Sequence, residues 1–129
     1  MGRALTRTFN AKGNCEALPY FEKALSLDSS SHGTLWEVGW SAGLCGEFKK
    51  SAEALETHAK FLEQESPRQY QAMIRTDRIM LSYVYSRLGN EALATANCEM
   101  TNPSQSGCKC TLPDSGEGFR CAAGKLASR

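Results

Sequence analysis

Apolar residues recur every three to four positions from about residue 3 to residue 100, and this stretch contains almost no run of β-branched residues. Such a period puts apolar side chains on one face of a helix, and that face has to be buried against another element. Glycines and polar clusters interrupt the pattern, so it predicts several short helices. The fold class expected for this part of the chain is therefore all-α.

The interruptions divide the helical stretch into three expected helix-turn-helix hairpins. Their turns are expected at Gly13, Gly46 and Gly89, and the connections between hairpins are expected at residues 28–31 and 66–67. A two-helix unit that recurs along a chain is typical of stacked repeats. Because no single unit can bury its own apolar face, about three of them are needed for a stable array.

The segment GNCEALPYFEKALSLDSS resembles the second half of a tetratricopeptide repeat (TPR), with Ala17, Phe21 and Ala24 at its small, aromatic and small positions. The second hairpin is similar at these positions: Leu35, Val38, Gly39, Ala42, Gly46, Phe48, Ser51 and Leu55. The third hairpin follows the family more loosely at these positions: Leu81, Ser82, Tyr85 and Gly89. Ser51 and His58 stand where the family prefers Ala. The resemblance spans about three-quarters of the chain and implies a right-handed array of about three TPR-like hairpins.

The C-terminal tail differs in composition from the helical stretch. Residues 101–129 are rich in Gly, Ser, Pro and Cys, and they show no clear helical period outside residues 121–127. Without crosslinks such a segment is expected to be mostly disordered. We therefore expect two parts: a TPR-like helical array over residues 1–100, and an irregular, Cys-rich, disulfide-stapled tail or cap over residues 101–129.

The TPR resemblance also implies that the first helix of each hairpin lines an inner groove. Carried over position by position, the groove contains these residues: Arg3, Arg7, Asn10, Trp36, Trp40, Ile79, Tyr83 and Ser86. Trp36 and Trp40 are one helical turn apart, and both Trp and Arg are enriched at binding hot spots. A protein or peptide partner is thus expected, with Arg pairing a carboxylate and Trp holding an apolar side chain. The alternative is that Trp36 and Trp40 pack against another part of the same chain, such as the tail.

Cys15 and Cys45 lie beside the expected turn glycines of consecutive hairpins, near the same edge of the stack. Equivalent positions in adjacent repeats are roughly 10 Å apart, whereas a disulfide needs Cα atoms within about 7 Å. An offset within the turns would close that gap. A bridge between the two repeats is one reading, and bonds to other partners or buried free thiols are the other.

The remaining cysteines, Cys98, Cys108, Cys110 and Cys121, fall within the last helix and the tail. Two disulfides among them would hold the tail on the array, and four cysteines allow three connectivities. Direct pairing of Cys108 with Cys110 is sterically the least comfortable of these. The alternatives are reduced thiols or a zinc site of the same four thiolates, although C-x-C is a weaker chelating spacing than C-x2-C.

The small net charge and the lack of catalytic or metal-binding spacings argue against several function classes. Fifteen basic and fourteen acidic residues leave a net charge of +1, so neither nucleic acid nor a membrane surface is expected as a partner. No apolar run has the length of a membrane span. His32 and His58 have no spacing typical of a metal pair or of a nucleophile with its base, and surface or packing roles are expected for both. We expect a non-catalytic interaction or assembly module without a cofactor, acting alone or within a larger assembly.

The cellular compartment of the protein decides whether its cysteines are expected to form disulfides or to bind metal. An even count in a short chain is typical of secreted or periplasmic proteins, so an extracytoplasmic localisation is expected. In the cytosol the same cysteines favour metal, which gives the alternative of an intracellular repeat protein with a zinc-bound tail. A thiol redox protein that uses Cys108 and Cys110 is the third reading.

Overall fold

The computed structural model describes residues 11–112 and 118–123 of the 129-residue chain. In order along the chain, these residues form the following elements: α2 (Ala11–Leu27), α3 (His32–Cys45), α4 (Phe48–Glu65), α5 (Gln71–Arg87), α6 (Glu91–Thr101), β1 (Cys108–Thr111) and β2 (Arg120–Ala123). The prediction of a mostly helical chain is confirmed. Among the described residues, no helix is both long and apolar enough to cross a membrane.

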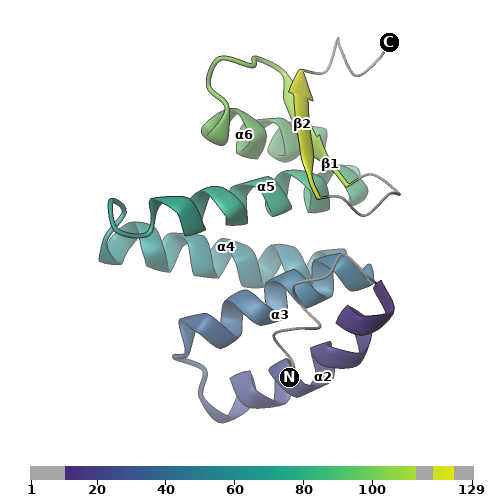
Figure 1. The fold of residues 1–129 in the computed structure, drawn as a ribbon, viewed down its shortest axis with the longest axis vertical. Helices are drawn as coiled ribbons and strands as arrows, with labels where there is room; N and C mark the ends of the chain where they lie inside the picture. The colour runs from purple at the N-terminus through teal and green to yellow at the C-terminus, as the bar shows by residue number, and fades with distance from the viewer. Residues whose placement is uncertain (1–10, 113–117, 124–129) are drawn as a thin grey trace.

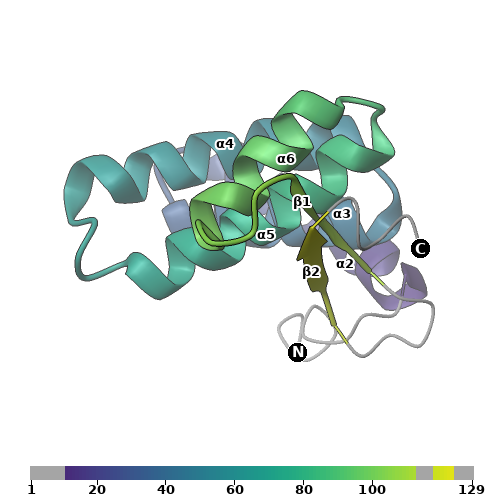
Figure 2. The ribbon, with the colours of Figure 1, turned by 90° about the horizontal axis from the view of Figure 1, so that it is seen from above.

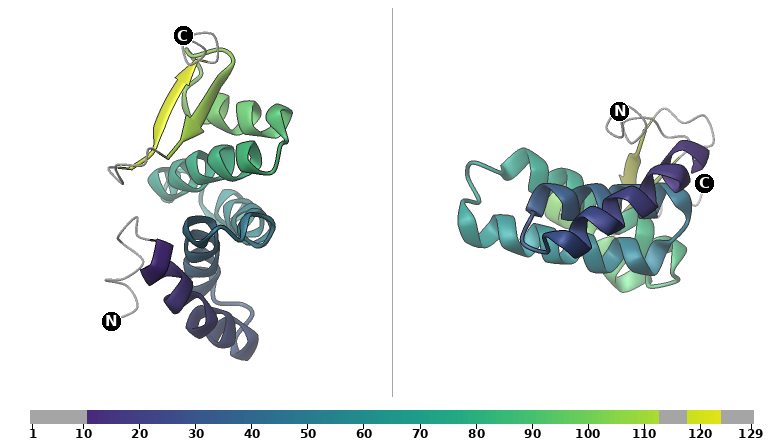
Figure 3. Two further views of the ribbon diagram at one scale, coloured as in Figure 1. Left: turned by 90° about the vertical axis from the view of Figure 1, so that its right-hand side faces the viewer. Right: turned by 90° about the horizontal axis from the view of Figure 1, so that it is seen from below.

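The helices form a stack in which each one packs mainly on its neighbours in sequence. Contacts join α2 to α3, α3 to α4, α4 to α5 and α5 to α6, and the chain reverses direction at each short connection (Figure 1). The two strands pair as an antiparallel hairpin that contacts α5 and α6 at one end of the stack. From above and from the side, this hairpin lies to one side of the helices (Figures 2 and 3).

Two of the three expected turn glycines are confirmed, and the third is not. Gly46 and Gly89 end helices with φ of 96° and 83°, a region that favours glycine because it has no Cβ. The turn expected at Gly13 is wrong, because α2 continues through this residue. One glycine costs a helix about 1 kcal/mol. Burial of the neighbouring Ala17 and Leu18 offsets that cost.

The tail is more regular than its composition indicated. Residues 108–111 and 120–123 form strands, with Cys110 opposite Cys121 and Cys108 opposite Ala123. The expectation of an irregular tail is therefore wrong for these residues, as is a helical reading of the first part of residues 121–127. Alternation along β1 turns Cys108 and Cys110 toward the helices, where both are fully buried. Residues 124–127 lie outside the described part of the chain.

Two groups of buried apolar side chains form the core of the stack. One lies between α3, α4 and α5 and consists of Leu44, Ala52, Leu55, Met80, Leu81 and Val84. The other lies between α2, α3 and α4 and consists of Leu18, Val38, Ala42 and Ala54. Small residues bring α3 and α4 together, because a Cβ on Gly39 would lie 2.5 Å from Cδ2 of Leu55. In the same contact, the Ser51 hydroxyl donates to the Gly39 carbonyl at 2.7 Å.

Substitution of Gly39 tests this close approach. Gly39→Ala is expected to lower the free energy of unfolding by about 1–3 kcal/mol, because Leu55 is fully buried and has to move. Gly33→Ala, in the same helix, is the matched control, since nothing lies within 4 Å of the added Cβ. That control is expected to be neutral or to stabilise by up to about 1 kcal/mol. Urea unfolding followed by circular dichroism measures both, and equal effects would contradict the proposed contact.

Candidate functional site

Five aromatic side chains from α3, α4, α5 and the start of the β2 segment form one continuous group. We call it the aromatic patch, and it consists of Trp36, Trp40, Phe48, Tyr83 and Phe119. The Trp36 and Trp40 ring centroids are 5.6 Å apart, and Phe119 lies 5.8 Å from Trp40 and 5.4 Å from Tyr83. Phe48 meets Tyr83 edge-on at 5.8 Å. All five side chains are partly buried and pack on the larger core group.

The patch depends on positions that are far apart in sequence. Trp36 and Trp40 are one turn apart on α3, so their side chains share a face. Tyr83 comes from α5, and Phe119 immediately precedes β2, whose pairing with β1 brings it back to the helices. At one end of the patch the Arg87 guanidinium lies 5.3 Å from the Phe48 ring centroid, in cation–π geometry. Arg87 is exposed, so the patch has a positive charge beside it.

Some of the residues expected in the groove are brought together and others are not. Trp36, Trp40 and Tyr83 meet in the aromatic patch. Ile79 lies one turn before Tyr83 on α5 but packs instead against the buried cysteines of the tail. Ser86 lies near the end of α5, where its carbonyl accepts a hydrogen bond from the backbone of Gly89.

The N-terminal groove residues Arg3, Arg7 and Asn10 lie outside the described residues. Sequence reasoning did not place Phe48, Phe119 or Arg87 in the site. The alternative in which the tryptophans pack against the tail did point to a contact with this region. The contact between Trp40 and Phe119 is such a contact.

All six cysteines form disulfides. Cys15 pairs with Cys45 at a Cα separation of 4.9 Å, which links the start of α2 to the end of α3. The distance is shorter than that between equivalent repeat positions because the two helices run in opposite directions. One residue near the beginning of α2 therefore meets the last residue of α3.

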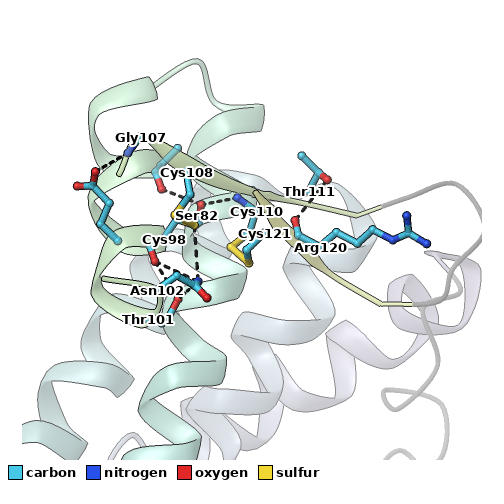
Figure 4. The surroundings of a disulfide bond; sticks show 12 residues. Ser82, Cys98, Thr101, Asn102, Gly107, Cys108, Cys110, Thr111, Arg120 and Cys121 are labelled. Carbon is cyan, nitrogen blue, oxygen red and sulfur yellow. Dashed lines mark hydrogen bonds between the residues drawn. A yellow bond between two sulfur atoms is a disulfide. The ribbon is translucent and has the colours of Figure 1, made fainter. Parts of the chain in front are cut away.

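In the tail, Cys98 pairs with Cys108 and Cys110 pairs with Cys121 (Figure 4). This selects one of the connectivities that sequence reasoning left open. The first bond fastens β1 to α6, and the second joins the two strands. The two disulfides lie against each other, since the Sγ atoms of Cys98, Cys110 and Cys121 all lie within 4.8 Å of one another.

A buried histidine–aspartate pair joins α4 to α5. Nδ1 of His58 lies 2.5 Å from Oδ2 of Asp77, and both side chains are fully buried. Burial raises the pKa of Asp77 above its usual value, while the His58 hydrogen bond and the Arg78 charge act in the opposite direction. Nε2 of His58 has no hydrogen-bond partner in the described part of the chain, so the pair is not joined there to a nucleophile. It matches the packing role expected for His58.

Arg78, next to Asp77, is the centre of a second polar group. Its guanidinium donates to Oε1 of Glu56 and Oδ1 of Asn97, both at 3.1 Å, and to the Glu63 carboxylate at 3.2 and 3.3 Å. Glu56 also accepts a 2.8 Å hydrogen bond from the Tyr85 hydroxyl. Burial and this contact with Glu56 raise the pKa of Tyr85 to about 12. The group ties α4, α5 and α6 together.

Comparison of the chain with protein-family models, with curated proteins and with solved structures finds no match in any of the three. Function therefore has to be argued from the side chains that the fold brings together. The aromatic patch and the paired disulfides of the tail are the two features that extend beyond core packing.

Phe119→Ala tests whether the tail rests on the tryptophans. Loss of the ring is expected to expose Trp40 to water and to shift tryptophan emission to longer wavelength, with unchanged helical circular dichroism. Tyr20→Ala is the control, because Tyr20 is 79% exposed on α2. Emission that is the same in wild type and Phe119→Ala would contradict the contact.

Tyr85→Phe tests the polar group on α5. Loss of the hydrogen bond to Glu56 is expected to cost about 1 kcal/mol near neutral pH. Because folding raises the pKa of Tyr85, this advantage of the wild type is fully present below about pH 10 and is lost as the pH rises through about 12. The measurements are urea unfolding and the phenolate absorbance difference between the two proteins. A midpoint near pH 10 in that difference would show that the tyrosine is not held by Glu56.

Proposed function

We propose that this protein is a non-catalytic interaction module whose aromatic patch binds an aromatic or large apolar side chain of a protein or peptide partner. In this proposal the helical stack is a right-handed, TPR-like array of about three hairpins. The observation that best supports the proposal is the packing of the Phe119 ring against both Trp40 and Tyr83. A side chain from outside the helices already occupies the position expected for a ligand.

The composition of the patch supports binding. Tryptophan, tyrosine and arginine are the residues most enriched at binding hot spots. Trp36, Trp40 and Tyr83 are all partly buried, which holds their rings in place and lowers the entropy lost when a partner binds. The Phe119 ring is the model for the ligand, and we propose that a partner's ring exchanges with it.

Charge beside the patch favours a partner with a carboxylate. Arg87 is exposed and lies over the Phe48 ring at one end of the patch. An arginine can form a paired hydrogen bond with a carboxylate. The favoured ligand is therefore a peptide segment with an aromatic side chain and a nearby acidic residue or C-terminal carboxylate.

A non-catalytic role is supported by the position of the His58–Asp77 pair. Both side chains are fully buried between α4 and α5, where a substrate has no access to them. The pair and the Arg78 group both join α4 to α5 through polar contacts between their side chains. Among the described residues, binding on the aromatic patch is thus better supported than turnover.

We further propose that the protein works outside the cytoplasm, as a secreted or periplasmic module that acts alone or in a larger assembly. Three disulfides fit an extracytoplasmic protein. The two in the tail fasten β1 to α6 and β2 to β1.

Selection of a random peptide display library on the oxidised protein tests the proposal. Enriched peptides are expected to share an aromatic residue and an acidic group. Their affinity for Trp40→Ala is expected to fall about tenfold or more. Affinity for Phe119→Ala is expected to rise, because this variant removes the competing ring.

Tyr20→Ala is again the matched control, since it removes an exposed aromatic ring on α2 that is not part of the patch and should leave binding unchanged. Circular dichroism of each variant verifies that it is folded. Two results would retire the proposal: no enrichment of any peptide, or enriched peptides that bind wild type and Trp40→Ala equally.

A further inference from the structure

We propose that the reduced tail is a metal site, in which Cys98, Cys108, Cys110 and Cys121 bind one zinc-class ion as thiolates. The site is separate from the aromatic patch, and the inference does not depend on partner binding. It rests on the way the fold gathers these sulfur atoms and on contacts that hold the segment without disulfides.

Three separate local rules bring the sulfur atoms together. Residues two apart on a strand share a face, so Cys108 and Cys110 both point toward the helices. The antiparallel register puts Cys121 directly opposite Cys110, with 4.0 Å between their Cα atoms. Cys98 is fully buried on α6, facing this strand pair (Figure 4).

The resulting arrangement is close to what a tetrahedral ion requires. Zinc–sulfur bonds are about 2.3 Å, which places the four sulfurs roughly 3.8 Å from one another. The Sγ atoms of Cys98, Cys110 and Cys121 already lie within 4.8 Å of one another. Cys98 is bonded to Cys108 at 2.07 Å and Cys110 to Cys121 at 2.08 Å, so both bonds have to open and the two sulfurs of each pair have to move apart by roughly 1.7 Å before all four bind one ion.

Contacts other than disulfides hold the segment in position after reduction. The backbone N–H of Cys110 donates to Oγ of Ser82 at 2.9 Å, and that hydroxyl donates to the carbonyl of Ala94 at 2.7 Å. The backbone N–H of Gly107 donates to the Glu99 carboxylate at 2.7 Å. These bonds tie both sides of the Cys108 position to α5 and α6, so the thiols stay close together.

Further contacts would stabilise the charged ligands. Nδ2 of Asn102 lies 3.8 Å from Sγ of Cys98 and donates toward it, as second-layer groups do at metal sites. Ile79 packs against the cysteines and limits the access of water.

The chemistry balances with a thiol or phosphine reductant and a divalent ion. Reduction of two disulfides takes up four electrons and four protons and gives four thiols. Binding of Zn²⁺ then forms four Zn–S bonds and releases four protons, leaving a complex of charge −2. Reoxidation by two equivalents of a small disulfide re-forms both protein disulfides, releases Zn²⁺ and yields four small thiolates.

The experiment uses the whole chain, reduced with a phosphine under argon and titrated with Zn²⁺ alone or with Co²⁺ as its coloured substitute. Reduced wild type is expected to bind one ion per chain and to give the charge-transfer and intense ligand-field bands of tetrahedral cobalt thiolate. The oxidised protein is expected to show neither. Binding of equal strength by the oxidised protein would overturn the proposal, because its sulfurs are in disulfides.

Two double variants with equal thiol counts separate the tail from the other cysteines. Cys15→Ser with Cys45→Ser leaves the tail complete and should bind like wild type. Cys98→Ser with Cys121→Ser removes two ligands and should weaken binding by about 100-fold or more. Equal binding by the two variants, or no uptake by reduced wild type, would overturn the proposal.

Alkylation of reduced wild type keeps the test decisive if a variant fails to fold. With Zn²⁺ present, the four tail cysteines should be protected from alkylation while Cys15 and Cys45 react, as mapped by mass spectrometry. Protection of Cys15 and Cys45 instead, or equal reaction at all six positions, would rule out the tail site.

Discussion

The other elements of the structure depend on the buried contact between α4 and α5. On one side of it α2 packs on α3 and α3 on α4, and on the other side α6 and β1 pack on α5. His58 and Asp77 meet fully buried at this junction, and Arg78 joins Glu56 beside them. Removing one partner of a buried hydrogen-bonded pair is costly, because the polar group of the other is left without a partner in the protein interior. The aromatic patch draws side chains from both sides, so its shape depends on this junction.

Local rules in the sequence account for most of the helices. Apolar spacing predicted the helices. Gly46 and Gly89 follow the ends of α3 and α5, because only glycine adopts a positive φ without strain. The same rule was wrong at Gly13, where burial of the following turns outweighs a cost of about 1 kcal/mol. Local preference is thus reliable where a glycine has to adopt an unusual backbone conformation, and unreliable where packing opposes it.

The candidate site was only partly predictable. Trp36 and Trp40 share a helix face by spacing alone, and the family resemblance put Tyr83 in the same groove. The seat of Phe119 depends instead on strand register in the tail, which composition did not reveal. The His58–Asp77 contact depends on how α4 and α5 face each other across a connection, and no motif in the sequence encodes that contact.

The placement of the disulfides has a consequence for how the chain is held together. One closes the loop between Cys15 and Cys45, and the other two close loops that begin at Cys98 or later. No crosslink therefore spans the stretch from α4 to the start of α6. A single cut of the backbone there would divide the oxidised protein into two pieces with no covalent link, each still closed by its own disulfides. Only side-chain contacts would join them, so the covalent reinforcement lies at the two ends and the middle of the stack relies on packing.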